Sequence, residues 1–392
     1  MISTLSEPTK PHRFWLFCIC AGMLLFFTQV TMLFPVLPLY VTQQWGEKAP
    51  VGLVVGAMAM GLLFFRPGIG LLIDRWGRKP VLWMGLLIML GILPLYAWAP
   101  NPFWLMGIRV FHGISQAAFA TTSQTLLADL VPAERRTAMM GYLAMSNTIG
   151  FSLGPLLGSV LFGVVGFSGV VLTMLGITLL GLVISLPLPW VVSQGRSLQT
   201  TLEPLTGFPW NYILKFPVRD ATFFFFIGSF LHGGVVTFLP LLMDNSALFY
   251  SLNAFIAVFV RFGLGRWERI LPQPWLVSGA LFCEGTALLG LSLLPQYLVF
   301  WSILYGVGFG TLFPVLSAIV SLSAPVEVRG RVYSFFLAGF DGGMMLGGAG
   351  LQPLTHWFSL RSLFTLLGGL GSGLSIVAFR QFAKSASRQS SQ

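Results

Sequence analysis

Long apolar runs separated by short polar loops constrain this sequence more than any other feature. The hydrocarbon core of a bilayer takes about 20 apolar residues per helix, and backbone in lipid must satisfy its hydrogen bonds internally. Pro35 and Pro38 predict an interruption inside the first run. We therefore predict an all-helical membrane protein with twelve spans, at 14–41, 51–73, 80–98, 103–128, 137–162, 168–192, 219–243, 246–265, 275–294, 297–322, 332–353 and 360–381.

The charge content excludes a soluble domain. Charged residues make up 9% of the 392 residues, whereas soluble domains carry about 25%. The net charge of +10 resides in short loops rather than on one face, which argues against a nucleic-acid partner. The three cysteines lie inside apolar runs, and no metal or cofactor motif is present. We expect a lipid bilayer as the surroundings, with no nucleic acid, metal or cofactor bound.

The basic residues predict which side each loop faces, because cytoplasmic loops are enriched in Lys and Arg. With both termini inside, 17 of the 22 cations are cytoplasmic, and the outer loops hold only Lys48 and Arg361. We predict a monomeric, multi-pass protein of a plasma membrane, typically the bacterial inner membrane, with both termini in the cytoplasm. The cytoplasmic cations are Lys10, Arg13, Arg75, Arg78, Lys79, Arg135, Arg136, Arg196, Lys215, Arg219, Arg266, Arg269, Arg329, Arg331, Arg380, Lys384 and Arg388.

The chain divides into two halves with a related pattern. We predict a six-helix bundle over 1–192, a cytoplasmic linker over 193–218 and a second six-helix bundle over 219–392. Parallel repeats of this kind indicate a pseudo-twofold axis along the membrane normal, with a site where the halves meet. The pairs that recur 193 to 195 positions apart are Pro132 and Pro325, Gly113 and Gly306, Arg136 and Arg329, Arg66 and Arg261, Asn147 and Asp341, and Gly154 and Gly348.

A short charged hairpin at residues 70–82, GLLIDRWGRKPVL, joins the second and third runs. It resembles the Gly-x-Leu-x-Asp-Arg-x-Gly-Arg-Lys/Arg signature of major facilitator superfamily transporters. The resemblance implies the fold of that family, with two six-helix halves and alternating access. It also implies a latch in which Asp74 faces basic side chains and the start of helix eleven in one conformation only, with Asp129 in the same network. The alternative is a plain topology signal. The predicted gating residues are Gly70, Asp74, Arg75, Gly77, Arg78, Lys79 and Asp129.

The fifth span carries glycines on one face. Gly150, Gly154, Pro155 and Gly158 resemble the helix-five signature of antiporter-type facilitators, with Ser159 in place of the last glycine. The resemblance implies export rather than uptake. Ordinary close packing of two helices is the alternative, because the same glycines would serve it.

Few acids lie inside the predicted spans, and an ionisable group there is a functional-site hypothesis by default. Asp341 in span eleven is the leading candidate for proton coupling, since that helix lines the cavity in the family's fold. A fixed ion pair with Arg261 or another cation is the alternative. Glu284 and His232 are further coupling candidates, with packing and structural roles as their alternatives. Span one contains no carboxylate, so the proton site that many related exporters keep there does not transfer.

Three arginines lie within the spans, where a charge needs an anionic, carbonyl or hydrated partner. Arg109 and Gly113 resemble the family's Arg-x-x-x-Gly signature in helix four. Arg66 and Arg261 repeat each other, and we expect them either to bind an anion together or to serve as a gate or an anchor between helices. With Gln29 of span one, these arginines are the candidates for contact with substrate or for gating.

These features predict a transporter and not an enzyme. The leading hypothesis is proton-coupled export of a small hydrophobic or amphipathic organic solute by alternating access. The alternatives are a carrier for uptake or exchange of organic anions, and a membrane sensor without net transport. The partners expected are a small-molecule solute and protons.

Overall fold

Helices account for nearly all of the chain that the structure describes. The computed structural model describes residues 13–190, 210–325 and 328–389. The first half contains α1 (Arg13–Trp45), α2 (Val51–Trp76), α3 (Arg78–Ala97), α4 (Pro102–Leu130) and α5 (Ala133–Ser185). The short α6 (Trp210–Ile213) precedes α7 (Val218–Leu242), α8 (Ser246–Ile270), α9 (Gln273–Leu293), η1 (Pro295–Tyr297), α10 (Leu298–Ser323), α11 (Arg329–Met345), η2 (Leu346–Gly350), η3 (Gln352–His356) and α12 (Leu360–Gln389).

The twelve predicted spans are confirmed. The 53-residue α5 contains spans five and six, because Gly166 leaves the helical path at φ 68° and ψ −173°, a conformation open to glycine. Nine helices among the described residues are long and apolar enough to cross a membrane, with α5 contributing one of them. The remaining spans are α4, which is more polar, and α11, which is 17 residues long and continues into the π-helix η2.

The predicted interruption of span one is wrong. Helix α1 runs without a break from Arg13 to Trp45 and contains both Pro35 and Pro38. Neighbouring helices in a membrane protein can satisfy the backbone groups that a proline frees, so the helix continues through it.

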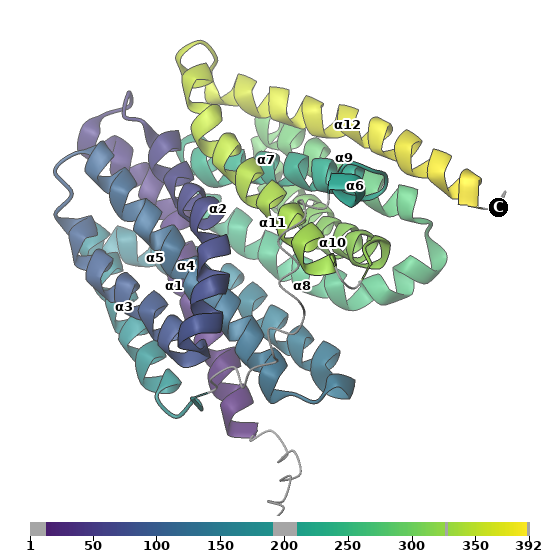
Figure 1. Ribbon diagram of the computed structural model, residues 1–392. Coiled ribbons are helices and arrows are strands. Elements are labelled where there is room, and N and C mark those ends of the chain that lie inside the picture. The colour runs from purple at the N-terminus through teal and green to yellow at the C-terminus, as the bar shows by residue number, and fades with distance from the viewer. Residues whose placement is uncertain (1–12, 191–209, 326–327, 390–392) are drawn as a thin grey trace, which may run out of the picture.

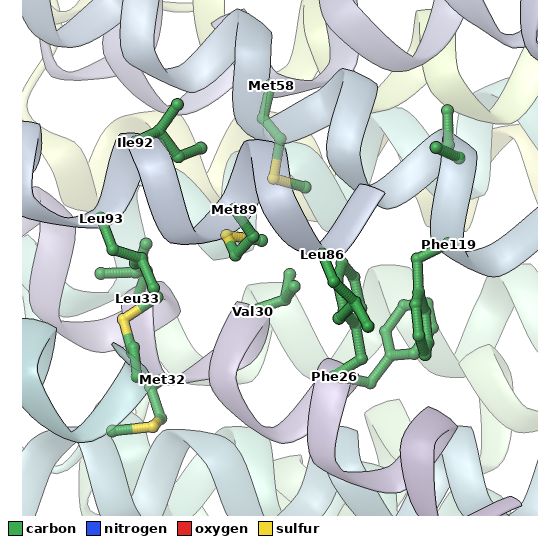
Figure 2. Close-up of a cluster of buried hydrophobic side chains, with 14 of the residues drawn as sticks. Phe26, Val30, Met32, Leu33, Met58, Leu86, Met89, Ile92, Leu93 and Phe119 are labelled. Atoms are coloured by element: carbon green, nitrogen blue, oxygen red, sulfur yellow. The ribbon is translucent and has the colours of Figure 1, made fainter. Parts of the chain in front are cut away.

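Each half encloses its own apolar core. In the first half, side chains of α1, α2, α3 and α4 meet, as Figure 2 shows for Met58, Met89 and their neighbours. Phe26 of α1 stacks on Phe119 of α4 with the ring centroids 4.3 Å apart. In the second half, Phe225 of α7 stacks on Phe336 of α11 at 4.4 Å. The exact division at 193–218 stays a prediction, because most of that segment lies outside the described residues.

The two halves meet along α2 with α11 and along α5 with α8, and α1 also packs against α7. Helices α1 to α5 gather in one bundle and α7 to α12 in another, with α2 and α11 side by side between them (Figure 1). Helices α5 and α8 form the other line of contact. We call the end of the bundle where α1 begins the inner end, since the basic residues predict that it faces the cytoplasm, and the opposite end the outer end.

Candidate functional site between the two halves

Glycines bring α2 against η2 at the outer end. The backbone N–H of Gly52 donates to Oε1 of Gln352 at 2.5 Å. A Cβ on Gly52 would overlap the carbonyl of Gly348, and one on Gly56 would lie 3.1 Å from the carbonyl oxygen of Met345. The backbones therefore touch where side chains would hold them apart.

A pair of serines makes the corresponding contact between α5 and α8. The hydroxyl of Ser152 donates to the carbonyl of Ser251 at 3.0 Å, and the hydroxyl of Ser251 donates to the carbonyl of Ser152 at 2.7 Å. Each serine thus satisfies the backbone of the other, and the two halves are joined on this side as well.

Each line of contact also carries an arginine bridge, closer to the inner end. On one side, Nη2 of Arg66 in α2 donates to Oδ1 of Asp341 in α11 at 3.2 Å. On the other side, Nη1 of Arg261 in α8 donates to Oγ1 of Thr148 in α5 at 2.6 Å. One bridge is therefore an ion pair and the other joins a cation to a neutral hydroxyl.

The two bridges occupy equivalent positions in the repeated halves. Arg66 follows Gly56 by ten residues, and Arg261 follows Ser251 by ten. Their partners are also equivalent, because Asp341 precedes Met345 by four residues and Thr148 precedes Ser152 by four. The predicted equivalence of Asp341 with Asn147 is thus off by one position. The alternative for Asp341 is an ion pair with Arg261 or another cation, and the cation that pairs with it is Arg66. The matched residues are Gly56 with Ser251, Met345 with Ser152, Arg66 with Arg261, and Asp341 with Thr148.

A cavity of about 390 Å³ opens between α5 and α8 on the inner side of the serine contact. Its position follows from the register, because the lining residues precede Ser152 on α5 and follow Ser251 on α8. A space between α5 and α8 therefore lies on the inner side of their serine contact, next to the bridge between Arg261 and Thr148. The lining residues are Gly141, Tyr142, Ala144, Met145, Thr148, Val258, Arg261 and Phe262.

The predicted gating loop forms a tight turn between α2 and α3. Gly77 adopts φ 87°, and its N–H donates to the carbonyl of Ile73 at 3.1 Å, which ends α2. Nε of Arg78 donates to Oδ2 of Asp129 in α4 at 2.7 Å. The side chain of Asp74, on which the latch depends, lies outside the described residues. Its role stays a prediction.

Lys79 has a different environment from the rest of the loop. Its side chain is only 4% exposed, and Nζ donates to the carbonyls of Leu186 and Leu188 at 2.7 and 2.8 Å, just beyond the end of α5. The ammonium also lies 4.9 Å from the ring centre of Trp83 and 5.1 Å from that of Trp190. A cation at the end of a helix compensates carbonyls that have no helical partner. Lys79 therefore ties α3 to the end of the first half.

The glycines of the helix-five motif face α1. A Cβ on Gly150 would lie 2.7 Å from the carbonyl oxygen of Leu24, one on Gly154 would overlap Thr31 of α1, and one on Gly158 would overlap the carbonyl of Met32. Pro155 lies inside the helix between them. The motif thus serves close packing within the first half, and its meaning for the direction of transport stays a prediction.

The other coupling candidates lie in the interior of the second half, away from Asp341. Glu284 of α9 is fully buried beside Gly228 and Gly308, and neither carboxylate oxygen has a hydrogen-bond partner among the described residues. Nδ1 of His232 lies 3.2 Å from the hydroxyl of Tyr305. The structure therefore does not bring the three candidates together.

The two remaining candidates lie inside the first half. Arg109 is 3% exposed, and its Nη2 donates to the carbonyl of Val55 at 3.2 Å, in the turn of α2 between Gly52 and Gly56. Gln29 is fully buried and accepts a hydrogen bond from Thr178. Among the described residues, no group of three or more His, Cys, Asp or Glu is placed to hold a metal ion.

A comparison with known families identifies the chain. The model of the Major Facilitator Superfamily matches residues 19–297. The chain belongs to the Major Facilitator Superfamily. It is a multi-pass membrane transporter and not an enzyme, and the resemblance carried by the loop at residues 70–82 is confirmed.

Curated relatives of this facilitator include exporters. It is 24% identical over 375 residues to the staphylopine export protein of Staphylococcus aureus, covering 91% of this chain and 93% of the relative. It is 22% identical over 398 residues to the multi-drug resistance efflux pump PmrA of Streptococcus pneumoniae, with the same two shares covered.

Solved structures show the same fold. A bacterial homologue of the human lysosomal transporter Spinster, in an inward-facing and unoccupied conformation, aligns with a TM-score of 0.74 and 15% identity over 97% of this facilitator and 99% of that chain. A POT family transporter in complex with 5-aminolevulinic acid aligns with a TM-score of 0.77 and 13% identity, over 94% and 96% of the two chains. The predicted all-helical fold of two six-helix halves is thereby confirmed.

Sequence reasoning missed several residues that join the halves. Ser152, Ser251 and Gln352 carry no charge and match no motif, so nothing in the sequence distinguished them. Thr148 could have been found, because it precedes Asp341 by 193 positions, the offset that three of the repeated pairs already share.

Proposed function

We propose that this facilitator exports a small hydrophobic or amphipathic organic solute in exchange for protons, by alternating access between the two halves. The observation that carries the proposal is the bridge between Arg66 and Asp341, a carboxylate 3% exposed that joins one half to the other. An ionised carboxylate buried without its cation is costly, so separating the bridge favours uptake of a proton. Protonation of Asp341 is thus linked to the relative position of the halves.

The driving force is sufficient for such an exchange. Each proton that crosses the membrane potential supplies about 2.3 kcal/mol per 100 mV. This corresponds to a solute gradient of about fiftyfold at 100 mV. Export as the direction is supported by the staphylopine exporter and the PmrA pump, since each matches over 93% of its own length.

Transport in reconstituted vesicles tests the proposal. The protein is reconstituted into vesicles so that its inner end is at the outer surface of the vesicle. The lumen is then made acidic. The vesicles are screened with naphthalene-2-sulfonamide, naphthalene-2-sulfonate and a quaternary naphthylmethylammonium, which share one body and differ in charge. We expect at least one of them to accumulate in the lumen above its external concentration, and to leak out when the pH gradient is collapsed.

Two other outcomes would contradict the proposal in different ways. Accumulation only under the reversed gradient identifies an uptake carrier, and the cation Arg261, whose described partner is a neutral hydroxyl, favours organic anions for such a carrier. Absence of both gradient-driven accumulation and counterflow of preloaded compound would instead identify a sensor without net transport.

A further inference from the structure

We infer that Arg261 and the cavity beside it bind the anionic group of the transported solute, so that the substrate is an amphipathic organic anion with an apolar body. This inference rests on the proposed transport function and specifies its substrate class. The structural relationship that motivates it is the difference between the two equivalent arginine bridges.

The charges at the two bridges do not balance. The cation of Arg66 is neutralised by Asp341, whereas Arg261 meets only the hydroxyl of Thr148. Among the carboxylates that the structure describes, none lies within 4.0 Å of the Arg261 guanidinium. A cation in a low-dielectric site without an anion is unfavourable, and a bound anion would remove that cost.

The hydrogen bonds of Arg261 leave room for such an anion. A guanidinium has five N–H donors in a rigid fork that fits carboxylate, sulfonate or phosphonate oxygens. Nη1 is occupied by Thr148, while Nε is buried and has no partner among the described residues. The guanidinium that lines the cavity therefore keeps a donor without an acceptor, and a charge-assisted hydrogen bond from it to an anion is stronger than a neutral one.

The walls of the cavity suit an apolar body attached to that anion. Tyr142 and Met145 of α5 and Val258 and Phe262 of α8 line it. Its volume of about 390 Å³ falls in the range of small-molecule sites, about 300–1,000 Å³. Methionine and aromatic side chains adapt to varied apolar shapes. The cavity therefore selects a solute more by its charge than by the shape of its apolar part.

The cavity is also placed where an exporter takes up its cargo. It lies between the halves on the inner side of the contact between Ser152 and Ser251. An anion on Arg261 therefore lies between α5 and α8, one helix from each half, which move relative to each other when the halves change position.

Binding of a matched pair of compounds tests the inference without any gradient. The full-length protein in phosphatidylcholine nanodiscs is titrated with naphthalene-2-sulfonate and with the neutral naphthalene-2-sulfonamide. We expect the native protein to bind the sulfonate about tenfold or more tightly than the sulfonamide, as a charge-assisted hydrogen bond implies. Arg261→Gln should abolish this preference and leave the sulfonamide affinity unchanged, and Arg261→Lys should keep part of it. Arg380→Gln, which removes an exposed cation on α12, should keep all of it.

Three results would overturn the inference. The first is a native protein without preference for the sulfonate. The second is an equal loss of both compounds in Arg261→Gln, which would indicate a structural role. The third is sulfonate binding that disappears in nanodiscs containing phosphatidylglycerol, because the anionic group at Arg261 would then belong to a lipid.

Failure of this inference can be distinguished from failure of the exporter proposal. Proton-driven transport of the sulfonamide or the quaternary ammonium, with no binding of the sulfonate, would contradict the anion site and support the exporter proposal. Sulfonate binding that depends on Arg261, with no transport under either gradient, would contradict the exporter proposal and support an anion site at Arg261.

Discussion

Nη2 of Arg66 lies 3.2 Å from Oδ1 and 3.1 Å from Oδ2 of Asp341, so an ion pair connects α2 of the first half to α11 of the second. The carboxylate is 3% exposed and the arginine 32% exposed. The acid therefore depends on this cation for its charge, while the cation retains contact with water.

Replacing Asp341 with Asn removes the protonatable group and keeps an acceptor for Arg66. We expect concentrative, pH-driven transport to be lost, while exchange of preloaded solute and solute binding remain. Uptake under an imposed pH gradient and counterflow without one, measured on the same vesicles, distinguish these activities. If the variant still concentrates solute when driven by protons, Asp341 is not the coupling site, and Glu284 or His232 becomes the next candidate.

A purely structural ion pair predicts a different result for the same variant. Breaking a buried pair costs about 3–5 kcal/mol, and less here because Arg66 is partly hydrated. The protein would then insert poorly, and Arg66→Gln combined with Asp341→Asn would restore its amount. Fluorescence-detected size exclusion of the single and double variants checks this alternative.

Replacing Asp74 with Asn tests the latch that the loop at residues 70–82 predicts. The change keeps the size of the side chain and removes the charge that would distinguish the two conformations. We expect transport to fall sharply while the amount of protein in the membrane stays near normal. Transport equal to that of the native protein would reduce the loop to a topology signal.

Cysteines at Ser152 and Ser251 test whether the outer contact must open during the cycle. The two residues bond each other's carbonyls, so cysteines at these positions are close enough to be joined by a short bis-methanethiosulfonate, which forms a reducible disulfide with each thiol. We expect cross-linking of the double variant to stop transport and reduction to restore it, in a background without Cys18, Cys20 and Cys283. Undiminished transport by the cross-linked protein would rule out alternating access through this contact.

Gly154→Ala should destabilise the first half. The added methyl group would overlap Thr28 and Thr31 of α1, and such overpacking costs about 1–3 kcal/mol. Gly163→Ala on the same helix is the matched control, because nothing lies within 4 Å of its Cβ position. Thermal unfolding in detergent should show a lower midpoint for the first variant only. Equal midpoints would mean that α1 and α5 adjust freely.

Lys79→Met should also lower stability, for a different reason. It leaves the carbonyls of Leu186 and Leu188 without their donor, and a hydrogen bond to a charged group contributes about 1.5–3 kcal/mol. The exposed Lys48 gives a control variant, Lys48→Met, with the same change of side chain. A drop of several degrees in the unfolding midpoint for Lys79 alone is the expected result, and matching midpoints would argue against an anchor.

The sequence was sufficient for the helices and insufficient for the contacts between the halves. Spanning length and hydropathy predicted the helices because each forms in lipid largely by itself. Even the boundary between spans five and six was placed at 162–168, where Gly166 bends α5. The partner of Asp341 could not be predicted, because it depends on how two rigid bundles meet. A one-residue error in the repeat offset was enough to select Asn147 instead of Thr148.

Buried polar residues in the spans were also ambiguous from sequence. Glu284, His232 and Asp341 are all ionisable groups in apolar runs, and hydropathy treats them alike. Their environments separate them, since the first two lie in the interior of one half and Asp341 lies where the two halves meet.

The inequality of the two arginine bridges has a consequence for stoichiometry. The repeat offers two equivalent positions for an acid opposite an arginine, and only Asp341 fills one, since Thr148 holds the other. In the proposed exchange, these two positions can therefore carry one proton per transport cycle, on Asp341. One proton entering as a monovalent anion leaves moves two positive charges inward, so export of such a solute would be driven by the membrane potential as well as by the pH difference.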